Sequence, residues 1–427
     1  MGSEKIDIIV VGGGGREHAI IKKLRESPRA GTIYTLPGNG GIEGDAICVP
    51  IKATDIDRVV SFAREHNIGF AVVAPDDPLV LGMADALREA GIPCFGPSKA
   101  AAQIEGSKVF AKNLMKKYGI PTADYRVFES ADDAITYIRS KEAPIVIKAD
   151  GLALGKGVTV AATREEAEEA VRKIMIDRAF GESGSRIVVE ECLTGHEVSV
   201  LAFTDGKTII PMVSSMDHKR ALTGGLGPNT GGMGTIAPNP YYTKDIADVC
   251  MEKIFRPTIL AMEKEGVPFT GCLYFGLMIT PDGPKVIEYN CRFGDPEAQV
   301  VLPLLQSDLL EIMLSCERGT LDKTDVKFSD MSSCCVVLVS SGYPGKYETG
   351  FPIRIGDVKG SIYFAGVKRD GDDIVTSGGR VLGVTCVAKT LGDAIKAAYQ
   401  DAEQIEFTGK YMRADIGAEA LSALSMK

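Results

Sequence analysis

The sequence lacks the features that mark membrane, zinc-binding and nucleic-acid-binding proteins. No apolar run approaches the roughly 20 residues that a membrane-spanning helix needs, and the opening MGSEKIDIIV has no signal-peptide layout. The ten cysteines form no C-x-x-C pair and no Cys/His spacing suited to zinc. The net charge is −9 with both signs well mixed, so no basic patch for nucleic acid is evident. We therefore expect a reduced, cytoplasmic protein that binds neither membrane nor nucleic acid.

Length and strand–helix alternation predict the domain organisation. The 427 residues suffice for about three domains. In the N-terminal part, buried strands alternate with helices, which predicts a parallel sheet with ligands at the carboxyl ends of its strands. A T-x-x-D pattern at Thr54 is expected to open one helix, and Pro78–Ala90 to form another. From about Met331, short β-type runs predict a mainly β domain with a helix at Leu391–Ala402.

The segment Lys285–Glu297, KVIEYNCRFGDPE, joins a buried strand to regularly spaced polar residues. If the strand continues, Glu288, Asn290 and Arg292 point to one face. A carboxylate beside an amide carbonyl suits Mg²⁺ or Mn²⁺ shared with phosphates, and a guanidinium can hold a second anion bidentately. The alternative is an edge strand with a solvated polar face, which is the commoner origin of such alternation.

The segment Asp217–Gly234, DHKRALTGGLGPNTGGMG, is so rich in glycine that no regular element is expected in it. Glycine lets backbone N–H groups approach a ligand closely, and Asp217, Lys219 and Arg220 lie at the mouth of the segment. A flexible linker would lack this charged cluster. The composition therefore favours a ligand-binding loop over a linker.

Two other glycine-rich turns are suited to phosphate. GGGGREH at Gly12–His18 leads into a helix N-terminus, where exposed N–H groups bind anions. It does not match the dinucleotide fingerprint, because the third glycine falls on Glu17 or His18. A tight turn that binds nothing is the alternative. Lys148 ends an apolar strand directly before the turn Ala149–Gly157, a position that proximity to a triphosphate explains better than solvation does.

These segments resemble the glycinamide ribonucleotide synthetases, purine-biosynthesis enzymes of the ATP-grasp superfamily. DHKR followed by GPNTGGMG, with NCRFGDPE downstream, is a specific signature. The likeness runs in the family's order over nearly the whole chain, and its other segments are VGGGGREHA at Val11–Ala19, LPGNGG at Leu36–Gly41, APDDPL at Ala74–Leu79, FGPSKAAAQIEGSK at Phe95–Lys108, PIVIKADGLALGKGV at Pro144–Val158 and SGGRVLGV at Ser377–Val384.

The resemblance implies an α/β protein of three domains. An N-terminal Rossmann-like parallel sheet domain is expected over residues 1–104, and a central ATP-grasp fold of the α+β type over 105–330. A small lid subdomain is expected at about 123–194, and a mainly β C-terminal domain over 331–427. The C-terminal domain is expected to wall a site shared with the other two.

The resemblance also implies where ATP and the metal bind. Glu190 would accept from the adenine amino group, and Glu197 would hold the ribose hydroxyls. Tyr274 and Phe275 stand where many ATP-grasp enzymes carry a second metal-binding glutamate, which leaves Glu288 and Asn290 for Mg²⁺ or Mn²⁺. The implied ATP-binding residues are Lys108, Lys148, Gly155, Lys156, Glu190, Cys192, Leu193 and Glu197.

The activity implied is ATP-dependent ligation of glycine to 5-phosphoribosylamine through a glycyl phosphate intermediate. Catalytic roles are expected for Lys148, Arg292 and Asp217. The implied substrate-binding residues are Gly13, Gly14, Gly15, Arg16, Glu17, Pro37, Gly38, Asn39, Asp76, Lys219, Arg220, Gly294, Asp295, Pro296 and Glu297. A monomer is expected, with transient contact to the enzyme that supplies phosphoribosylamine.

The chain departs from the family pattern at two loops. The family usually has one or two aspartates ahead of GPNTGGMG, where this chain has Thr223–Leu226. It commonly has Glu where Asp76 stands, so the carboxylate here is one methylene shorter.

Two other functions remain open at this stage. Another ATP-grasp carboxylate–amine ligase or carboxylase would keep Lys148 and Glu288 but would leave NCRFGDPE and GPNTGGMG unexplained. A non-catalytic nucleotide-binding regulator predicts loss of phosphate- or metal-binding residues, and here they are present together. The broken glycine fingerprint disfavours an NAD-dependent dehydrogenase.

Overall fold

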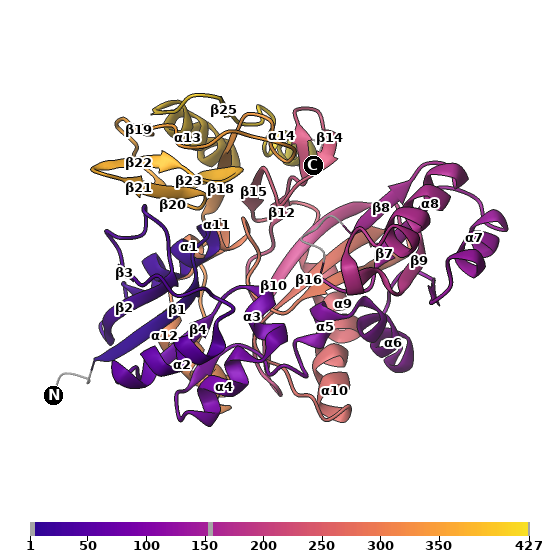
Figure 1. The fold of residues 1–427 in the computed structure, drawn as a ribbon, viewed down its shortest axis with the longest axis horizontal. Helices are drawn as coiled ribbons and strands as arrows, with labels where there is room; N and C mark the ends of the chain where they lie inside the picture. The colour runs from indigo at the N-terminus through magenta and orange to yellow at the C-terminus, as the bar shows by residue number, and fades with distance from the viewer. Residues whose placement is uncertain (1–4, 153–156, 426–427) are drawn as a thin grey trace.

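The computed structural model describes residues 5–152 and 157–425, and most of the chain lies in or against four sheets (Figure 1). The C-terminal strands lie above the N-terminal sheet in this view, and a small sheet with its two helices projects to the right. Within the described ranges, no helix is both long enough and apolar enough to cross a membrane.

The N-terminal sheet is parallel throughout and has the order β3-β2-β1-β4-β5. Its strand order reverses between β1 and β4, and ligands of such sheets bind beyond the carboxyl ends of the strands at this point. The parallel sheet expected from the sequence is confirmed. Its elements are β1 (Ile6–Gly12), α1 (Gly15–Leu24), β2 (Ala30–Pro37), β3 (Ile47–Cys48), α2 (Ile56–Glu65), β4 (Phe70–Val73), α3 (Asp76–Leu81), α4 (Met83–Glu89) and β5 (Cys94–Phe95).

Two details of the helices in this region differ from expectation. Helix α2 is capped by Asp55, whose side chain accepts from the N–H of Arg58, and not by Thr54. The helix expected at Pro78–Ala90 is two helices, because Gly82 adopts a φ of 103° and ends α3 before α4 begins.

Two antiparallel sheets form the middle of the chain, a central sheet of order β11-β10-β16-β17 and a small sheet of order β6-β9-β7-β8. The central sheet holds β10 (His196–Asp205), β11 (Ile209–Pro211), β16 (Thr270–Thr280) and β17 (Gly283–Asn290). The small sheet holds β6 (Tyr125–Phe128), β7 (Ile145–Ala149), β8 (Val158–Ala161) and β9 (Ile187–Glu191). The helices of this region are α5 (Gln103–Gly106), α6 (Lys108–Tyr118), α7 (Ala131–Arg139), α8 (Arg164–Val171), α9 (Lys244–Cys250), α10 (Arg256–Lys264), α11 (Ala298–Val301) and α12 (Leu309–Arg318).

The C-terminal sheet is antiparallel, has the order β12-β15-β18-β23-β20, and takes two of its strands from the middle of the chain. These are β12 (Met216–Asp217) and β15 (Gly234–Ala237), which flank the glycine-rich segment. The other elements are β18 (Ser332–Ser340), β20 (Ser361–Phe364), β21 (Val367–Asp370), β22 (Asp373–Thr376), β23 (Arg380–Ala388), α13 (Leu391–Glu403), β25 (Lys410–Tyr411) and α14 (Ala418–Ser425).

The expectation that Asp217–Gly234 contains no regular element is wrong. Strands β13 (Arg220–Leu222) and β14 (Leu226–Asn229) pair as a hairpin, and its turn uses positive φ at Gly224 and Gly225. The glycines therefore supply a hairpin turn, and Asp415 holds it by accepting from the N–H of Gly224 at 2.8 Å.

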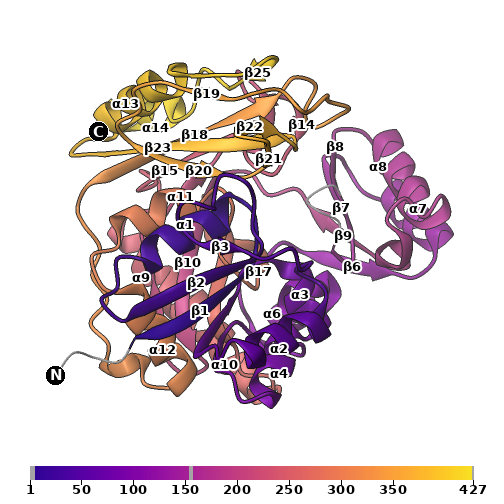
Figure 2. The ribbon, with the colours of Figure 1, turned by 60° about the vertical axis from the view of Figure 1, so that its left-hand side comes forward.

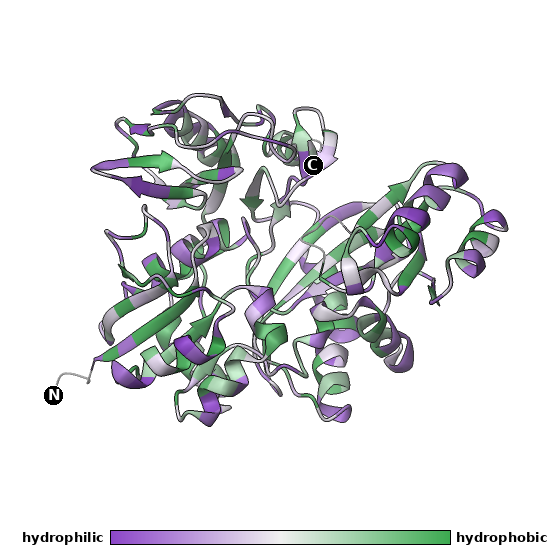
Figure 3. Ribbon diagram, viewed as in Figure 1, coloured by the Kyte–Doolittle hydropathy of each residue, from purple (hydrophilic) through white to green (hydrophobic). Residues whose placement is uncertain are grey.

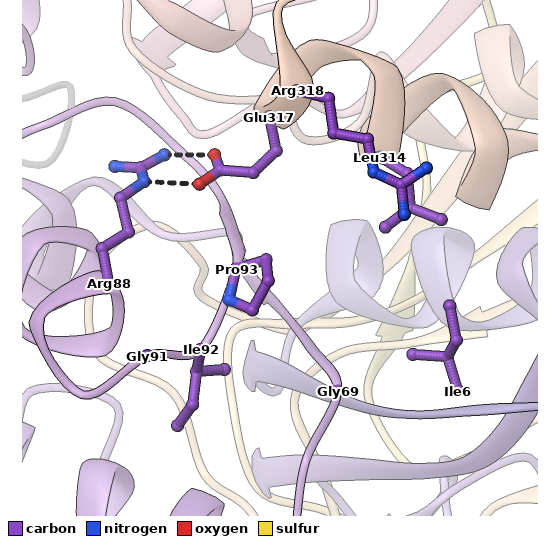
Figure 4. A pocket seen from close by; sticks show the side chains of 9 residues that line it. All are labelled: Ile6, Gly69, Arg88, Gly91, Ile92, Pro93, Leu314, Glu317 and Arg318. Atoms are coloured by element: carbon purple, nitrogen blue, oxygen red, sulfur yellow. Dashed lines mark hydrogen bonds and ion pairs between the residues drawn. The ribbon is translucent and has the colours of Figure 1, made fainter.

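Apolar residues are concentrated on the strands, and the outer faces of α7 and α8 are polar (Figure 3). One buried cluster runs from the N-terminal sheet through α12 to the C-terminal sheet. The N-terminal sheet is also fastened by Arg88 of α4, whose Nε and Nη2 donate to Glu317 of α12 at 2.9 and 2.7 Å (Figure 4). Nη2 also donates to the carbonyls of Cys94 and Gly96, so this guanidinium fixes the N-terminal sheet to α12.

Candidate functional site

A cavity of about 980 Å³ lies where the central, small and C-terminal sheets meet. In Figure 2 the strand β17 of the central sheet, which carries the E-x-N motif, lies between the N-terminal sheet and the small sheet and below the C-terminal sheet. The expected site residues that line the cavity are Arg16, Asp76, Lys108, Lys148, Glu190, Cys192, Leu193, Glu197, Asp217, Lys219, Arg220, Glu288, Asn290, Arg292, Asp295 and Glu297. Gly155 and Lys156 lie outside the described residues. The remaining expected residues, all described, belong to the turns beside Arg16 and Asp295 and to Pro37–Asn39.

Lys148 and Glu190 form a buried ion pair at one end of the cavity. They lie on the neighbouring strands β7 and β9, and Lys148 Nζ is 3.0 Å from Glu190 Oε2. Lys112 Nζ of α6 lies 3.0 Å from the same oxygen, while Lys148 also donates to the carbonyl of Ile287. Burial lowers the pKa of Lys112 to about 8. Glu190 Oε1 is buried without a hydrogen-bond partner in the described part of the chain, so one oxygen remains available to a ligand.

Lys108 lies at the start of α6, which is capped by Ser107 and ends at Gly119 with a φ of 68°. Its Nζ donates to the carbonyl of Gly151, within the turn Ala149–Gly157, at 3.2 Å. Burial lowers the pKa of this ammonium. Lys108 and Lys112 are four residues apart and so share one face of α6, a spacing that could have pointed to Lys112 as a site residue.

Glu288 and Asn290 project into the cavity from β17, opposite Gly276 and Tyr274 of β16. Burial acts against ionisation of Glu288, but the charges of Lys219 and Lys148 prevail and lower its pKa. Within residues 5–152 and 157–425, no protein group hydrogen-bonds to either of these two side chains. An ionised carboxylate and a free amide oxygen form a donor set that fits Mg²⁺. The described residues contain no cluster of three His, Cys, Asp or Glu metal ligands, so phosphate oxygens and water would complete the shell.

Arg292 is held at the cavity wall by Glu105, a residue that the sequence analysis did not single out. Arg292 Nη2 donates to Glu105 Oε1 at 2.8 Å and lies 3.9 Å from Asp76 Oδ2. The other oxygen of Glu105 accepts from the N–H of Cys291 at 2.6 Å. Arg292 Nε is buried and has no partner among the described residues, which leaves it free to donate to a ligand.

The C-terminal domain contributes Arg380 of β23 to the site, and this residue was also missed. Arg380 Nη2 donates to Asp295 Oδ2 at 2.9 Å, and Nη1 donates to the carbonyls of Asp295 and Gly231. The SGGRVLGV motif contains this arginine, but only the fold brings it to Asp295.

Close by, burial and the carboxylate of Glu297 raise the pKa of Asp217 well above its usual range. Asp217 Oδ1 is buried and lacks a hydrogen-bond partner in the described residues.

The glycine turn after β1 packs against the turn after β2. A Cβ on Gly13 would lie 2.3 Å from the carbonyl oxygen of Gly38, so only glycine allows this approach. Asn39 Nδ2 donates to the carbonyl of Gly13 at 2.8 Å. Glu17 accepts from the N–H of Gly14 at 2.5 Å and from Arg16 Nε at 2.6 Å. The two turns form one unit that presents Arg16 to the cavity.

Glu197 is the second residue of β10, at the rim of the cavity, and it pairs with Lys219, with Oε2 and Nζ 2.9 Å apart. The Glu197 carboxylate raises the pKa of Lys219. Cys192 and Leu193 follow β9 and also line the cavity. His196, to which the sequence analysis gave no role, stacks on Tyr241 with ring centroids 3.5 Å apart.

Comparisons with known proteins agree over the whole chain. Family models described as phosphoribosylglycinamide synthetase match in three parts, the N domain at residues 6–105, the ATP-grasp (A) domain at 106–298 and the C domain at 333–419. A phosphoribosylamine–glycine ligase of Vibrio cholerae is 46% identical over 98% of this chain and 99% of its own length. One of Caldanaerobacter subterraneus is 46% identical over 96% of this chain and 99% of its own.

Solved structures give the same result. The phosphoribosylamine–glycine ligase of Thermotoga maritima superposes with a TM-score of 0.86 at 34% identity, covering 96% of this chain and all of that one. A biotin carboxylase of Campylobacter jejuni, 14% identical, superposes with a TM-score of 0.73 over 99% of this chain and 95% of its own, which shows the shared ATP-grasp fold alone. With relatives at this identity over nearly their full length, the chain belongs to the phosphoribosylglycinamide synthetase family.

Proposed function

We infer that this chain is an ATP-dependent ligase that joins glycine to 5-phosphoribosylamine in purine biosynthesis. The products are glycinamide ribonucleotide, ADP and phosphate. The observation that carries the inference is the convergence in one cavity of the Lys148–Glu190 pair, the free oxygens of Glu288 and Asn290, and the guanidinium of Arg292. The family membership supplies the identity of the two substrates.

The end of the cavity between the small and central sheets suits ATP. Glu190 Oε1 can accept from the adenine amino group, because Lys112 and Lys148 already occupy the other oxygen. Lys108 and Lys148 are placed to meet phosphates, and Glu197 at the rim is assigned to the ribose hydroxyls. Gly155 and Lys156 complete the proposed ATP set from outside the described residues.

Glu288 and Asn290 are assigned to the divalent cation. When bound there, the cation would neutralise charge on the transferring phosphoryl group. An ATP-grasp neighbour, the biotin carboxylase domain of Hydrogenobacter thermophilus, was solved with MgADP, which supports Mg²⁺ with ATP. We propose further that Mn²⁺ can replace Mg²⁺, because both are hard cations that accept oxygen ligands.

The chemistry proceeds by activation of a carboxylate. An oxygen of the glycine carboxylate attacks the γ-phosphorus and ADP leaves, which gives glycyl phosphate. The amine of phosphoribosylamine then attacks the acyl carbon, phosphate leaves, and the nitrogen releases one proton. Asp217, whose buried Oδ1 has no hydrogen-bond partner among the described residues, is the group that we assign to this proton. The substrates supply both nucleophiles, so the protein contributes position, charge and exclusion of water.

The acceptor side lies toward the N-terminal turns. Arg292 and Arg16 offer positive charge to the substrate phosphate, and the turns at Gly13–Glu17 and Pro37–Asn39 support them. We assign the loop Gly294–Glu297, Asp76, Lys219 and Arg220 to the same substrate. These assignments rest on position in the cavity and on the family signature.

The domain limits and cellular setting are also proposals. We propose domains at residues 1–104, 105–330 and 331–427, with the lid subdomain at about 123–194. We further propose a cytoplasmic monomer that contacts the enzyme supplying phosphoribosylamine only transiently. Light scattering during size exclusion tests the monomer directly.

The deciding experiment is phosphate release from Mg·ATP, with glycine and freshly made phosphoribosylamine added singly and together. Release that requires both, with glycinamide ribonucleotide in the mass spectrum, supports the ligase. Lys148→Ala and Glu288→Ala should abolish the release. The matched controls are Lys396→Ala and Glu403→Ala, which change exposed side chains of α13 and should leave the rate unchanged.

The alternatives give different outcomes. Turnover with another acid or amine would keep the ATP-grasp assignment and overturn the substrates. ATP binding without turnover in any combination would overturn the enzyme and favour a nucleotide-binding regulator.

A further inference from the structure

Two of the four histidines in the chain lie at contacts between the substrate loops and the C-terminal domain. His18 follows Arg16 and Glu17 on α1 and is 1% exposed. Its Nδ1 accepts a hydrogen bond from the backbone N–H of Phe364 at 2.9 Å, and its Nε2 lies 2.9 Å from Asp45 Oδ2. Because a backbone N–H can only donate, Nδ1 must be unprotonated and the proton must be on Nε2.

His218 has the opposite arrangement. Its Nδ1 lies 3.1 Å from the carbonyl oxygen of Gly234, and its Nε2 accepts from the backbone N–H of Gly417 at 3.0 Å. A carbonyl can only accept, so here the proton is on Nδ1 and the lone pair on Nε2. Each ring is therefore neutral, and the two rings carry their protons on different nitrogens.

His18 is connected to Arg380 through Phe364 and the strand pair β20–β23. The backbone of Phe364 is held by the N-terminal domain at both its N–H and its carbonyl, because the N–H donates to His18 Nδ1 and Asn39 Nδ2 donates to the carbonyl at 3.1 Å. Phe364 lies on β20 and pairs with Leu382 of β23, two residues beyond Arg380. A shift of Phe364 would thus be carried along the sheet to the guanidinium that meets Asp295.

The His218 contact leads to the other side of the same site. His218 stands between Asp217 and Lys219, both of which line the cavity. Gly417 directly precedes α14, and α14 carries Glu419 to the cavity wall. A Cβ on Gly417 would lie 2.4 Å from Ile395, so this backbone is packed tightly against α13.

We propose that His18 and His218 are positioning residues for the ligation, neutral rings of opposite tautomer that hold the C-terminal domain on the two substrate loops. In this way they set the place of Arg380 over Asp295 and of Asp217 beside Glu297. The proposal rests on the proposed function for its kinetic consequence. The tautomers that it predicts for the two rings can be tested without any enzymatic activity.

The surroundings keep both rings neutral. Burial lowers the pKa of His18, although Asp45 acts in the opposite direction, and the other charges facing the ring are Lys22 and Arg25. Burial and the charge of Arg413 lower the pKa of His218 to about 4, against Asp415 and Glu419.

The first test is the ¹⁵N spectrum of the full chain labelled at its histidines, recorded from pH 6 to 8. We expect one Nε2–H ring and one Nδ1–H ring that do not titrate, assigned by their loss in single variants. Titration of His18 or His218, or the same tautomer at both, overturns the proposal whether or not the protein is a ligase.

The second test replaces each histidine by asparagine or glutamine, whose side-chain oxygen can take the place of one of the two ring nitrogens. Asn can place its oxygen near Nδ1, and Gln can place its oxygen near Nε2. His18→Asn should therefore keep the acceptor for Phe364, and His218→Gln the acceptor for Gly417.

We expect the opposite pair, His18→Gln and His218→Asn, to raise the KM for phosphoribosylamine about tenfold, the effect of one lost hydrogen bond. The KM for ATP should stay unchanged, and the control His66→Ala should change neither constant. Equal effects of Asn and Gln at both positions would show that the rings serve only as packing and would overturn the proposal. Absence of turnover in the unaltered protein would instead overturn the proposed function.

Discussion

Lys148 and Glu190 meet across two neighbouring strands of the small sheet, with Nζ and Oε2 3.0 Å apart. Lys112 reaches the same oxygen from α6 at the same distance, and all three side chains are at least 95% buried. One carboxylate oxygen therefore pairs with two ammonium groups, and the second oxygen is buried without a hydrogen-bond partner among the described residues. The arrangement ties α6 to the small sheet at the place where ATP is proposed to bind.

Glu190→Gln should weaken both the fold and ATP binding. The change leaves two buried ammonium groups without a counter-charge, a situation that costs about 3–5 kcal/mol. We expect a loss of that order in the free energy of unfolding and at least a tenfold weaker ATP affinity, measured by urea unfolding and calorimetry. The control Glu191→Gln alters an exposed neighbour that pairs with Lys285, and it should cost less than about 1 kcal/mol. Equal costs for the two variants would contradict the buried triad.

Arg292→Lys should impair substrate use more than ATP binding. A lysine keeps the positive charge, but its single nitrogen cannot occupy both the position of Nη2 beside Glu105 and the position of the unpartnered Nε. We expect kcat/KM for phosphoribosylamine to fall at least tenfold, about 1.4 kcal/mol or more, while the ATP dissociation constant stays within about twofold. Steady-state kinetics check this, with Arg318→Lys as the control. A selective loss of ATP affinity would place Arg292 on the nucleotide side.

Acid should destabilise the fold through His218. Its pKa of about 4 lies below the ordinary value of 6.5, so the unfolded chain binds the proton more readily. Above about pH 6.5 the ring is neutral in both the folded and the unfolded chain, and His218 does not lower the free energy of unfolding. As the pH falls toward 4, the unfolded chain takes up the proton first, and the free energy of unfolding decreases by up to about 3 kcal/mol.

Urea unfolding at pH 7.5, 6, 5 and 4 measures this loss. His218→Gln cannot titrate and should show a shallower decline than the unaltered chain over the same interval. If the free energy of unfolding of both proteins declined in parallel, groups other than His218 would be responsible for the loss of stability in acid.

Gly13→Ala should separate the two N-terminal turns. The added methyl would lie 2.3 Å from the carbonyl oxygen of Gly38, and backbone must move to admit it. We expect a loss of about 1–3 kcal/mol in the free energy of unfolding, together with a higher KM for phosphoribosylamine. Gly44→Ala is the control, because a Cβ there meets nothing within 4 Å and should change stability by less than about 0.5 kcal/mol. Equal free energies of unfolding for the two variants would mean that the backbone of the two turns moves apart to admit the methyl group without loss of stability.

Local chemistry alone determined several parts of this protein. Helix α6 runs from Lys108 to Tyr118, because Ser107 caps one end and Gly119 ends the other within the same short stretch. The parallel N-terminal sheet follows from strand–helix alternation in the same way. The placement of Glu288 and Asn290 on the cavity side of β17 follows from strand periodicity, which is also a local property, whereas Arg292 lies beyond the end of the strand at Asn290.

Tertiary structure decided what no local pattern contains. Lys112, Glu105 and Arg380 became site residues because they contact groups that are distant in the chain, such as the Arg380–Asp295 pair separated by 85 residues. The glycine-rich segment is joined to the C-terminal sheet because β12 and β15, which flank it, pair in a sheet whose other strands begin at Ser332. Strand pairing and buried ion pairs depend on which surfaces meet after folding, whereas helix caps and periodicity depend only on neighbours in sequence.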